Sequence, residues 1–240
     1  MTGAATSATI RTLIFDVLGT VVDEAGTITA ETVAAAATGG LDPDRGWRLA
    51  EDWMRRHDSL ISEIAAGHEP WRSNDALRRA SLLDAVEAAG VRHLLPPDVV
   101  EHLARAGHRP RPWPDSPPGL RTLQRSFVVV ALSNADLAQL ADMSADGGLS
   151  WHCVLSAELV KAYKPDPAVY HMALDRLGLD PAHTMMVASH PWDLRAAEQQ
   201  GMRTAYVSRP GEASPAPEDH FDIRARSLAD LAEILTPGKV

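Results

Sequence analysis

The fold is decided by the stretch Ile10-Arg11-Thr12-Leu13-Ile14-Phe15-Asp16-Val17-Leu18-Gly19. Its first six residues are mostly apolar or β-branched, which is typical of a buried strand, and Gly19 favours a turn. Asp16 is therefore expected at the carboxyl end of a strand, at the point where the chain enters a loop.

The part of the chain that follows this strand has a different pattern. Residues 29–107 show helical spacing of apolar residues, in Ala- and Leu-rich stretches that are interrupted at glycines and prolines. We expect about four helices in this block and no strand. Because the block follows the first strand, it is predicted to form an inserted helical cap, with a cleft between the cap and the rest of the fold.

The remaining sequence alternates between strand and helix patterns. The predicted strands are 127–132, 153–155, 184–188 and 204–207, and the predicted helices lie near 135–143, 167–177 and 192–201. The proline-rich segment 109–118 is expected to disfavour helix and to be a boundary or a stiff crossing segment. This alternation predicts an α/β fold with a doubly wound parallel-sheet (Rossmann-like) core. The predicted domains are a core of residues 1–21 and 108–240 and a cap of residues 22–107.

Charge and cysteine content exclude several classes of partner. The 240 residues include 23 basic and 32 acidic side chains, a formal net charge of -9, and no cluster of Lys and Arg. We therefore expect no nucleic-acid partner and no membrane association. Cys153 is the single cysteine and the first nine residues do not resemble a signal peptide, so we expect a cytoplasmic protein.

Polar residues follow the predicted strands at four places. They are Asp16, the pair Ser133 and Asn134, the segment that leads to Lys164, and the segment 189–193. The carboxyl ends of parallel strands meet at one edge of the sheet, and ligands of such folds bind outside that edge. Candidate chemistry is expected there, below the cap.

These four places carry motifs, and with them the sequence resembles the haloacid dehalogenase-like hydrolases, within them the 2-haloacid dehalogenase (type II) branch. The motifs are Phe15-Asp16-Val17-Leu18-Gly19-Thr20-Val21-Val22-Asp23, Leu132-Ser133-Asn134, Tyr163-Lys164-Pro165-Asp166-Pro167 with Tyr170, and Ser189-His190-Pro191-Trp192-Asp193. They occur in order, and the resemblance covers nearly the whole chain. It implies that Asp16 is a nucleophile that forms a covalent ester, which water then hydrolyses.

The resemblance also implies roles for the other motif residues. Lys164 would keep Asp16 ionised, Asp193 would orient Lys164 or polarise the hydrolytic water, and His190 would activate that water. The implied substrate- or halide-binding positions are Thr20, Leu18, Ser133, Asn134, Met54 and Tyr170.

Several of these residues also have a purely structural interpretation. Ser133 and Asn134 suit the N-cap of the helix predicted after them. Asp193 suits the first turn of a helix, where a negative charge is stabilised. His190 fits a partly exposed loop, and Tyr170 fits a packed core.

The residue two positions after Asp16 separates two kinds of chemistry. The phosphatases of the superfamily carry an acid there that protonates the leaving oxygen, but this sequence has Leu18. They also bind Mg²⁺ through acidic residues of the fourth motif, in which only Asp193 is acidic here. A halide leaves without a proton, so the sequence favours a metal-independent dehalogenase with no cofactor.

One position departs from the resemblance. Well-studied members have an Arg directly after a Trp in the cap, which binds the substrate carboxylate or halide, whereas Met54 follows Trp53 here. Three alternatives therefore stay open: attack on another electrophilic carbon such as a strained ring, a phosphatase, and a non-catalytic binding protein. The expected partner is a small molecule, a halogenated carboxylic acid or similar, and the resemblance implies a homodimer.

Overall fold

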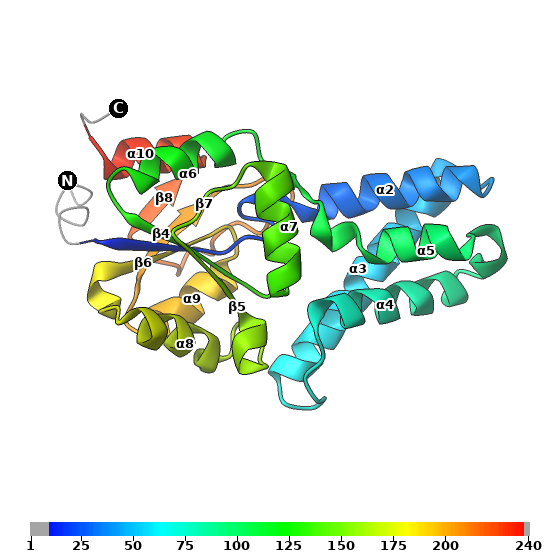
Figure 1. Cartoon of the computed structure of the whole chain (residues 1–240), viewed down its shortest axis with the longest axis horizontal. Coiled ribbons are helices and arrows are strands. Elements are labelled where there is room, and N and C mark those ends of the chain that lie inside the picture. Colours follow the sequence, from blue (N-terminus) through cyan, green and yellow to red (C-terminus); the bar gives the residue numbers. More distant parts are fainter. Residues whose placement is uncertain (1–9, 238–240) are drawn as a thin grey trace.

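The chain folds around a six-stranded parallel sheet (Figure 1). The computed structural model describes residues 10–237. The strands are β1 (Thr12–Phe15), β4 (Val128–Ser133), β5 (Cys153–Ser156), β6 (Thr184–Ala188), β7 (Arg203–Val207) and β8 (Ile223–Ala225). Their order is β5-β4-β1-β6-β7-β8, so β1 lies between β4 and β6, and Leu13 pairs in register with Val129 and Met185.

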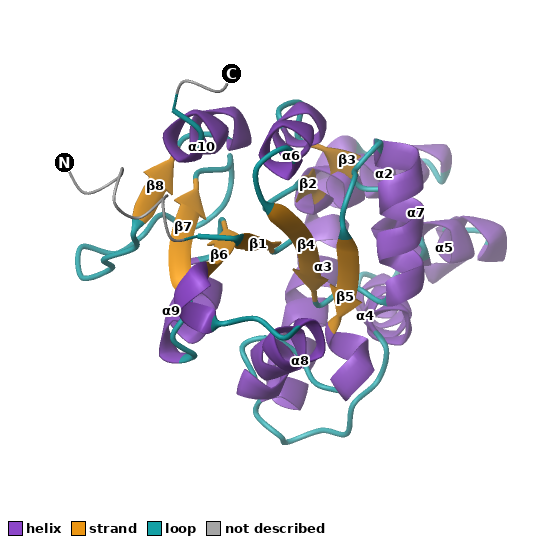
Figure 2. Cartoon of the chain, turned by 60° about the vertical axis from the view of Figure 1, so that its left-hand side comes forward, coloured by secondary structure: helices purple, strands orange, loops and turns teal. Residues whose placement is uncertain are grey.

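Helices cover both faces of this sheet, as Figure 2 shows. They are α6 (Ser116–Gln124), α7 (Leu137–Gly147), α8 (Pro167–Leu177), α9 (Pro191–Gln199) and α10 (Leu228–Leu235). Leu13 and Phe15 pack in one core with α6, α7 and α10, and Ile14 packs in a second core with α8 and α9. Strands that are buried on both faces need nearly continuous apolar sequence, as β1 has. The predicted doubly wound α/β fold is confirmed.

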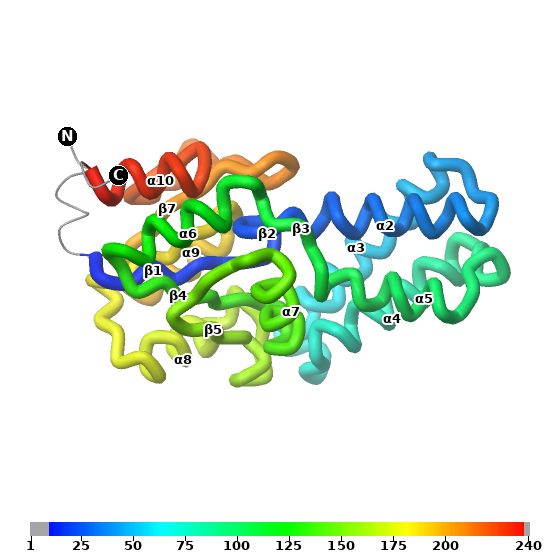
Figure 3. The backbone as a smooth tube through the Cα atoms, turned by 45° about the horizontal axis from the view of Figure 1, so that its top comes forward, coloured from blue at the N-terminus to red at the C-terminus, as the bar shows by residue number. Residues whose placement is uncertain are grey.

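An insertion of four helices follows the first strand, beyond the carboxyl ends of the sheet strands (Figure 3). The helices are α2 (Glu24–Thr38), α3 (Pro43–Ala65), α4 (Asn74–Ala88) and α5 (Pro97–Ala104). They share a separate apolar core that includes Leu49, Trp53 and Leu82. An antiparallel pair, β2 (Val22–Asp23) with β3 (Arg111–Pro112), joins the two ends of the insertion. The helical cap is thus confirmed, and its boundaries at residues 22 and 107 stay a prediction.

Short turns of 3₁₀ helix complete the fold, and they are η1 (Arg92–Leu94), η2 (Ala106–His108), η3 (Ala157–Val160) and η4 (Pro181–His183). Within residues 10–237, none of the helices combines the length and the apolar character that a membrane crossing needs.

The predicted strands and helices of the core occur close to their predicted positions, but α6, β8 and α10 were missed. The expectation that the prolines disfavour helix in residues 109–118 is wrong at its end, because Pro117 and Pro118 fall in the first turn of α6. A proline is tolerated there because its missing N–H would have no partner within the helix. The three residues of β8 are too few for a clear period-two pattern.

Candidate active site

The carboxyl ends of β1, β4 and β6 bring the predicted motifs together. Asp16 follows β1, Ser133 ends β4, and Ser189 follows β6, and these three strands are adjacent in the sheet. Lys164 comes from the segment between η3 and α8, where Asp166 caps the start of α8. The site is therefore assembled from segments that are far apart in sequence, since Asp16 and His190 are separated by 174 positions.

Asp16 is almost fully buried, and both of its carboxylate oxygens accept hydrogen bonds. Lys164 Nζ lies 2.8 Å from Oδ1, Thr20 Oγ1 donates to Oδ2 at 2.7 Å, and His190 Nδ1 lies 2.9 Å from Oδ2. Burial acts to raise the pKa of Asp16, but Lys164 and His190 outweigh it and hold that pKa well below its usual range. Asp16 is therefore ionised, as a carboxylate nucleophile must be.

Lys164 bridges two buried carboxylates. Its Nζ lies 2.5 Å from Oδ2 of Asp193 as well as 2.8 Å from Asp16. Burial acts to lower the pKa of Lys164, but the two carboxylates raise it. Asn134 holds the backbone of this lysine, because its Oδ1 accepts from Lys164 N at 2.7 Å and its Nδ2 donates to Lys164 O at 3.3 Å.

Asp193 and Tyr170 lie behind Lys164, away from the cavity. Tyr170 donates its hydroxyl proton to Oδ1 of Asp193 at 2.5 Å, and both side chains are fully buried. Burial raises the pKa of Asp193, although Lys164 acts in the opposite direction. Asp193 lies in the first turn of α9 and Tyr170 packs in the core, as their structural interpretation expects, and their roles in the reaction stay predictions.

Thr20 and Ser133 are also fully buried. Thr20 Oγ1 accepts a hydrogen bond from Ser189 N at 2.9 Å. This contact orients the Thr20 hydroxyl group so that its proton points at Asp16. Ser133 Oγ accepts a hydrogen bond from Ala135 N at 3.1 Å. The N-cap of α7 is Asp136, so the capping interpretation of Ser133 and Asn134 is wrong.

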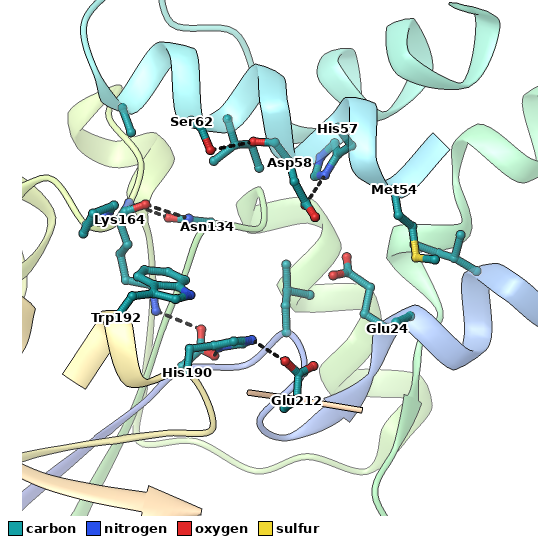
Figure 4. Close-up of a pocket in the computed structure, with 18 of the residues that line it drawn as sticks. Glu24, Met54, His57, Asp58, Ser62, Asn134, Lys164, His190, Trp192 and Glu212 are labelled. Carbon is teal, nitrogen blue, oxygen red and sulfur yellow. Dashed lines mark hydrogen bonds and ion pairs between the residues drawn. The ribbon is translucent and has the colours of Figure 1, made fainter. Parts of the chain in front are cut away.

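A cavity of about 710 Å³ separates the cap from the sheet edge (Figure 4). The predicted site residues that line it are Asp16, Leu18, Met54, Asn134, Lys164 and His190. Thr20, Ser133, Tyr170 and Asp193 are not among the lining residues. The volume is in the range of small-molecule sites.

The sequence did not indicate several polar residues of the cavity wall, which are Glu24, His57, Asp58, Arg78 and Glu212. They come from α2, α3, α4 and the loop after β7, and no motif links them to Asp16. Burial, aided by the charge of Arg78, lowers the pKa of His57 to about 4, so His57 is neutral near pH 7.

The guanidinium in the cavity wall belongs to Arg78, on a different helix from Met54. Arg55 and Arg56 both pair with Asp52 instead. Arg78 is buried, and its Nη2 lies 2.5 Å from Oε1 of Glu24. Burial raises the pKa of Glu24, although Arg78 acts to lower it.

The donors at Asp16 do not make up a metal site. Across residues 10–237, no group of three or more His, Cys, Asp or Glu side chains is arranged to hold a metal ion. The position between Asp16 and Asp193 is taken by the ammonium group of Lys164.

The fold and the site together define a class of capped hydrolases. In this class a helical cap covers a parallel sheet, and an ionised aspartate lies in the cleft between them at the end of the first strand. The chain belongs to the haloacid dehalogenase-like hydrolase family, whose model matches residues 10–201.

Known proteins place the chain within this family. It is 31% identical to (S)-2-haloacid dehalogenase 1 of Pseudomonas sp. (strain CBS-3), over 94% of this chain and 96% of that protein. Its fold is similar to the solved structure of the L-2-haloacid dehalogenase PA0810, with a TM-score of 0.85 and 32% identity over 95% of this chain and 100% of the other. The defluorinating L-2-haloacid dehalogenase Rha0230 gives a TM-score of 0.86 and 33% identity over 94% of this chain and 95% of the other.

Proposed function

We propose that the protein is a metal-independent dehalogenase that uses Asp16 to displace halide from an (S)-2-haloacid. The observation that carries this proposal is the geometry of Asp16, a buried carboxylate at the cavity wall with Nζ of Lys164 at one oxygen and Nδ1 of His190 at the other. The (S)-2-haloacid dehalogenase names of the relatives support the substrate class.

In the first half of the reaction, a carboxylate oxygen of Asp16 attacks the carbon that bears the halogen. The new C–O bond forms as the C–halogen bond breaks, and the halide leaves with the bonding electron pair. A halide needs no proton, so the apolar Leu18 in the cavity wall is compatible with this step. Attack from behind the leaving group inverts the substrate carbon.

In the second half, water adds to the ester carbon Cγ of Asp16. The Cγ–O bond to the product then breaks, and the hydroxyacid leaves with a proton on its new hydroxyl group. The sum is that R–X and water give R–OH, X⁻ and H⁺. Lys164, held by Asp193 and by the backbone contacts of Asn134, keeps a positive charge beside the reacting carboxyl throughout.

Arg78 is our candidate for binding the substrate carboxylate. It is a buried cation that lines the cavity, whereas Lys164 is already bound to two carboxylates and Met54 carries no charge. A planar guanidinium that holds one carboxylate oxygen of Glu24 has further N–H donors to offer a second carboxylate.

A second candidate is attack on an electrophilic carbon of a substrate without a carboxylate. The pairing of Arg78 with Glu24 favours it, because that pairing already supplies the guanidinium with a negative partner. A phosphatase is disfavoured by Leu18 and by the ammonium group between Asp16 and Asp193. The bonded arrangement of Asp16, Lys164 and Asp193 also argues against a non-catalytic binding protein.

The test is halide release from chloro-, bromo- and fluoroacetate and from both enantiomers of 2-chloropropionate, with EDTA present. We expect release from the (S) enantiomer by the wild type, none by Asp16→Asn, and full activity in the control Asp44→Asn, an exposed carboxylate on α3. A single turnover in ¹⁸O-labelled water should place ¹⁸O in Asp16. Release that persists in Asp16→Asn, or no release from any of these acids, contradicts the proposal.

A cytoplasmic location and a homodimer complete the proposal, and both stay predictions. Size-exclusion chromatography with light scattering tests the dimer directly.

A further inference from the structure

His190 lies between two carboxylates, and only one of them has a role in the proposed reaction. Its Nδ1 is 2.9 Å from Oδ2 of Asp16, and its Nε2 is 3.1 Å from Oε2 of Glu212. Figure 4 shows Glu212 on the far side of the ring, bonded to His190 at the wall of the cavity. Glu212 comes from the loop after β7 and belongs to none of the four motifs.

The loop of the first motif fits closely against this pair. Gly19 has a φ of +74°, and a Cβ at this position would lie 2.6 Å from Oε1 of Glu212 and 3.0 Å from the ring of His190. The positive φ favours glycine here, and the missing side chain leaves room beside the loop for Glu212 and the ring of His190.

An ionised carboxylate accepts hydrogen bonds and donates none, and each ring nitrogen of His190 lies within 3.1 Å of a carboxylate oxygen, so the site favours the doubly protonated ring. Burial acts to lower the pKa of His190, but Asp16 and Glu212 raise it to about 10. Glu24, on α2, lines the same cavity, and the charge of His190 acts to lower the pKa of Glu24. Lys164 lies on the other oxygen of Asp16.

Ester formation changes the charge on one side of His190 only. When Asp16 becomes an ester, its negative charge is lost, and Glu212 is the remaining carboxylate paired with the ring.

The two oxygens of Asp16 differ in their donors. Oδ2 has two donors, Thr20 and His190, whereas Oδ1 has one. If Oδ1 attacks the substrate, Oδ2 is the ester carbonyl oxygen and already lies in a two-donor oxyanion hole.

We propose that Glu212 is a positioning residue that keeps His190 doubly protonated in the ester intermediate, so that the Nδ1–H group stabilises the negative charge on Oδ2 during ester hydrolysis. The inference rests on the proposed function and adds a specific residue to its second half. Water adds to Cγ, its proton passes to solvent in the cavity because His190 already carries both of its protons, and the carbonyl electron pair moves onto Oδ2. That pair then re-forms the C=O bond as the Cγ–O bond to the product breaks. The product oxygen takes up a proton from solvent, and the regenerated carboxyl group of Asp16 releases its proton to solvent.

The first test needs no turnover. Asp16→Asn replaces the nucleophile with a neutral side chain, as the ester does, and the ring nitrogens of His190 can be followed by ¹⁵N NMR against pH. We expect His190 to stay doubly protonated at pH 7.5 in Asp16→Asn and to become neutral at that pH in the double variant Asp16→Asn/Glu212→Gln. Equal titration of His190 in the two proteins overturns the inference.

The second test separates the two halves of the reaction. In Glu212→Gln, we expect the halide burst of the first turnover to be retained and ester hydrolysis to slow by roughly 10- to 100-fold, so that the ester on Asp16 accumulates in mass spectra. The matched control is Glu218→Gln, an exposed glutamate of the same loop, which should behave as wild type. Glu212→Asp should recover part of the hydrolysis rate.

The outcomes distinguish this inference from the proposed function. If the wild type releases no halide, the proposed function is contradicted. The NMR test of Glu212 can still be carried out, because it needs no turnover. Normal wild-type turnover, with the two half-reactions slowed equally or not at all in Glu212→Gln, overturns the inference alone.

Discussion

The ammonium nitrogen of Lys164 lies 2.8 Å from Oδ1 of Asp16, and both side chains are almost fully buried. An ion pair in the interior is costly to break, because the charge that is left has lost its hydration and its partner. Lys164 therefore stabilises both the ionised nucleophile and the fold that contains it.

Replacement of Lys164 by Met should affect activity and stability together. We expect halide release to fall by about 10²–10³-fold and the free energy of unfolding to fall by about 3–5 kcal/mol at pH 8. Without the ammonium group, Asp16 and Asp193 repel each other, and the pKa of one rises above its unfolded value. A carboxyl group with a raised pKa contributes stability at low pH, and this contribution is lost as pH rises. In urea unfolding, the free energy of unfolding of Lys164→Met should therefore fall short of the wild-type value by less at pH 5 than at pH 8. An equal deficit at both pH values contradicts this prediction.

The charge of His190 should make stability depend on pH on the basic side. Its pKa is about 10 in the folded protein against an ordinary value of 6.5, so its stabilisation is complete below pH 6.5 and is lost as pH rises to 10. The difference in unfolding free energy between wild type and His190→Asn should therefore be largest at pH 6 and smallest at pH 10. The exposed His171 provides the control variant His171→Asn. A difference that does not change between these pH values rules out a charged His190.

Arg78 and its neighbour Arg79 form a matched pair for testing carboxylate recognition. Arg78 is buried in the cavity wall, and Arg79 is half-exposed and pairs with Glu101. We expect Arg78→Gln, combined with Glu24→Gln to avoid an unpaired buried acid, to raise KM for (S)-2-chloropropionate at least about tenfold. Arg79→Gln should leave KM unchanged.

An uncharged substrate completes this comparison. Turnover of 2-chloropropionamide should not depend on Arg78 if the guanidinium binds the carboxylate. Unchanged KM for the acid in the double variant would instead favour the second candidate, a substrate without a carboxylate.

Alanine variants at Gly19 and Gly148 distinguish the effect of backbone strain from the effect of close contact. Both have a positive φ, +74° and +61°, but a Cβ at Gly148 would meet nothing within 4 Å. Gly148→Ala should cost about 1–2 kcal/mol in urea unfolding and keep full activity. Gly19→Ala should cost more and lower halide release as well, because the new methyl group displaces Glu212 and His190. Equal behaviour of the two variants would show that the contact at Gly19 has no consequence.

Much of the fold could be predicted because its signals are local. The apolar run that ends at Asp16, the alternation of strands and helices, and the helical block after the first strand each lie within one stretch of chain. The motif residues could be placed at one edge because parallel strands must end on the same side. Among the elements that were missed, α6, β8 and α10 have a local signal that is short or masked by prolines.

The α/β class, the inserted cap and the nearness of Asp16, Lys164, His190 and Asp193 could all be predicted from order along the chain. Which side chains face the cavity follows from the three-dimensional packing alone. This packing buried Thr20, Ser133 and Tyr170 outside the cavity lining, and it brought Arg78 and Glu212 into the cavity wall from a cap helix and a distant loop. These contacts join residues far apart in sequence, and they depend on how the cap packs over the sheet edge, which no single segment encodes.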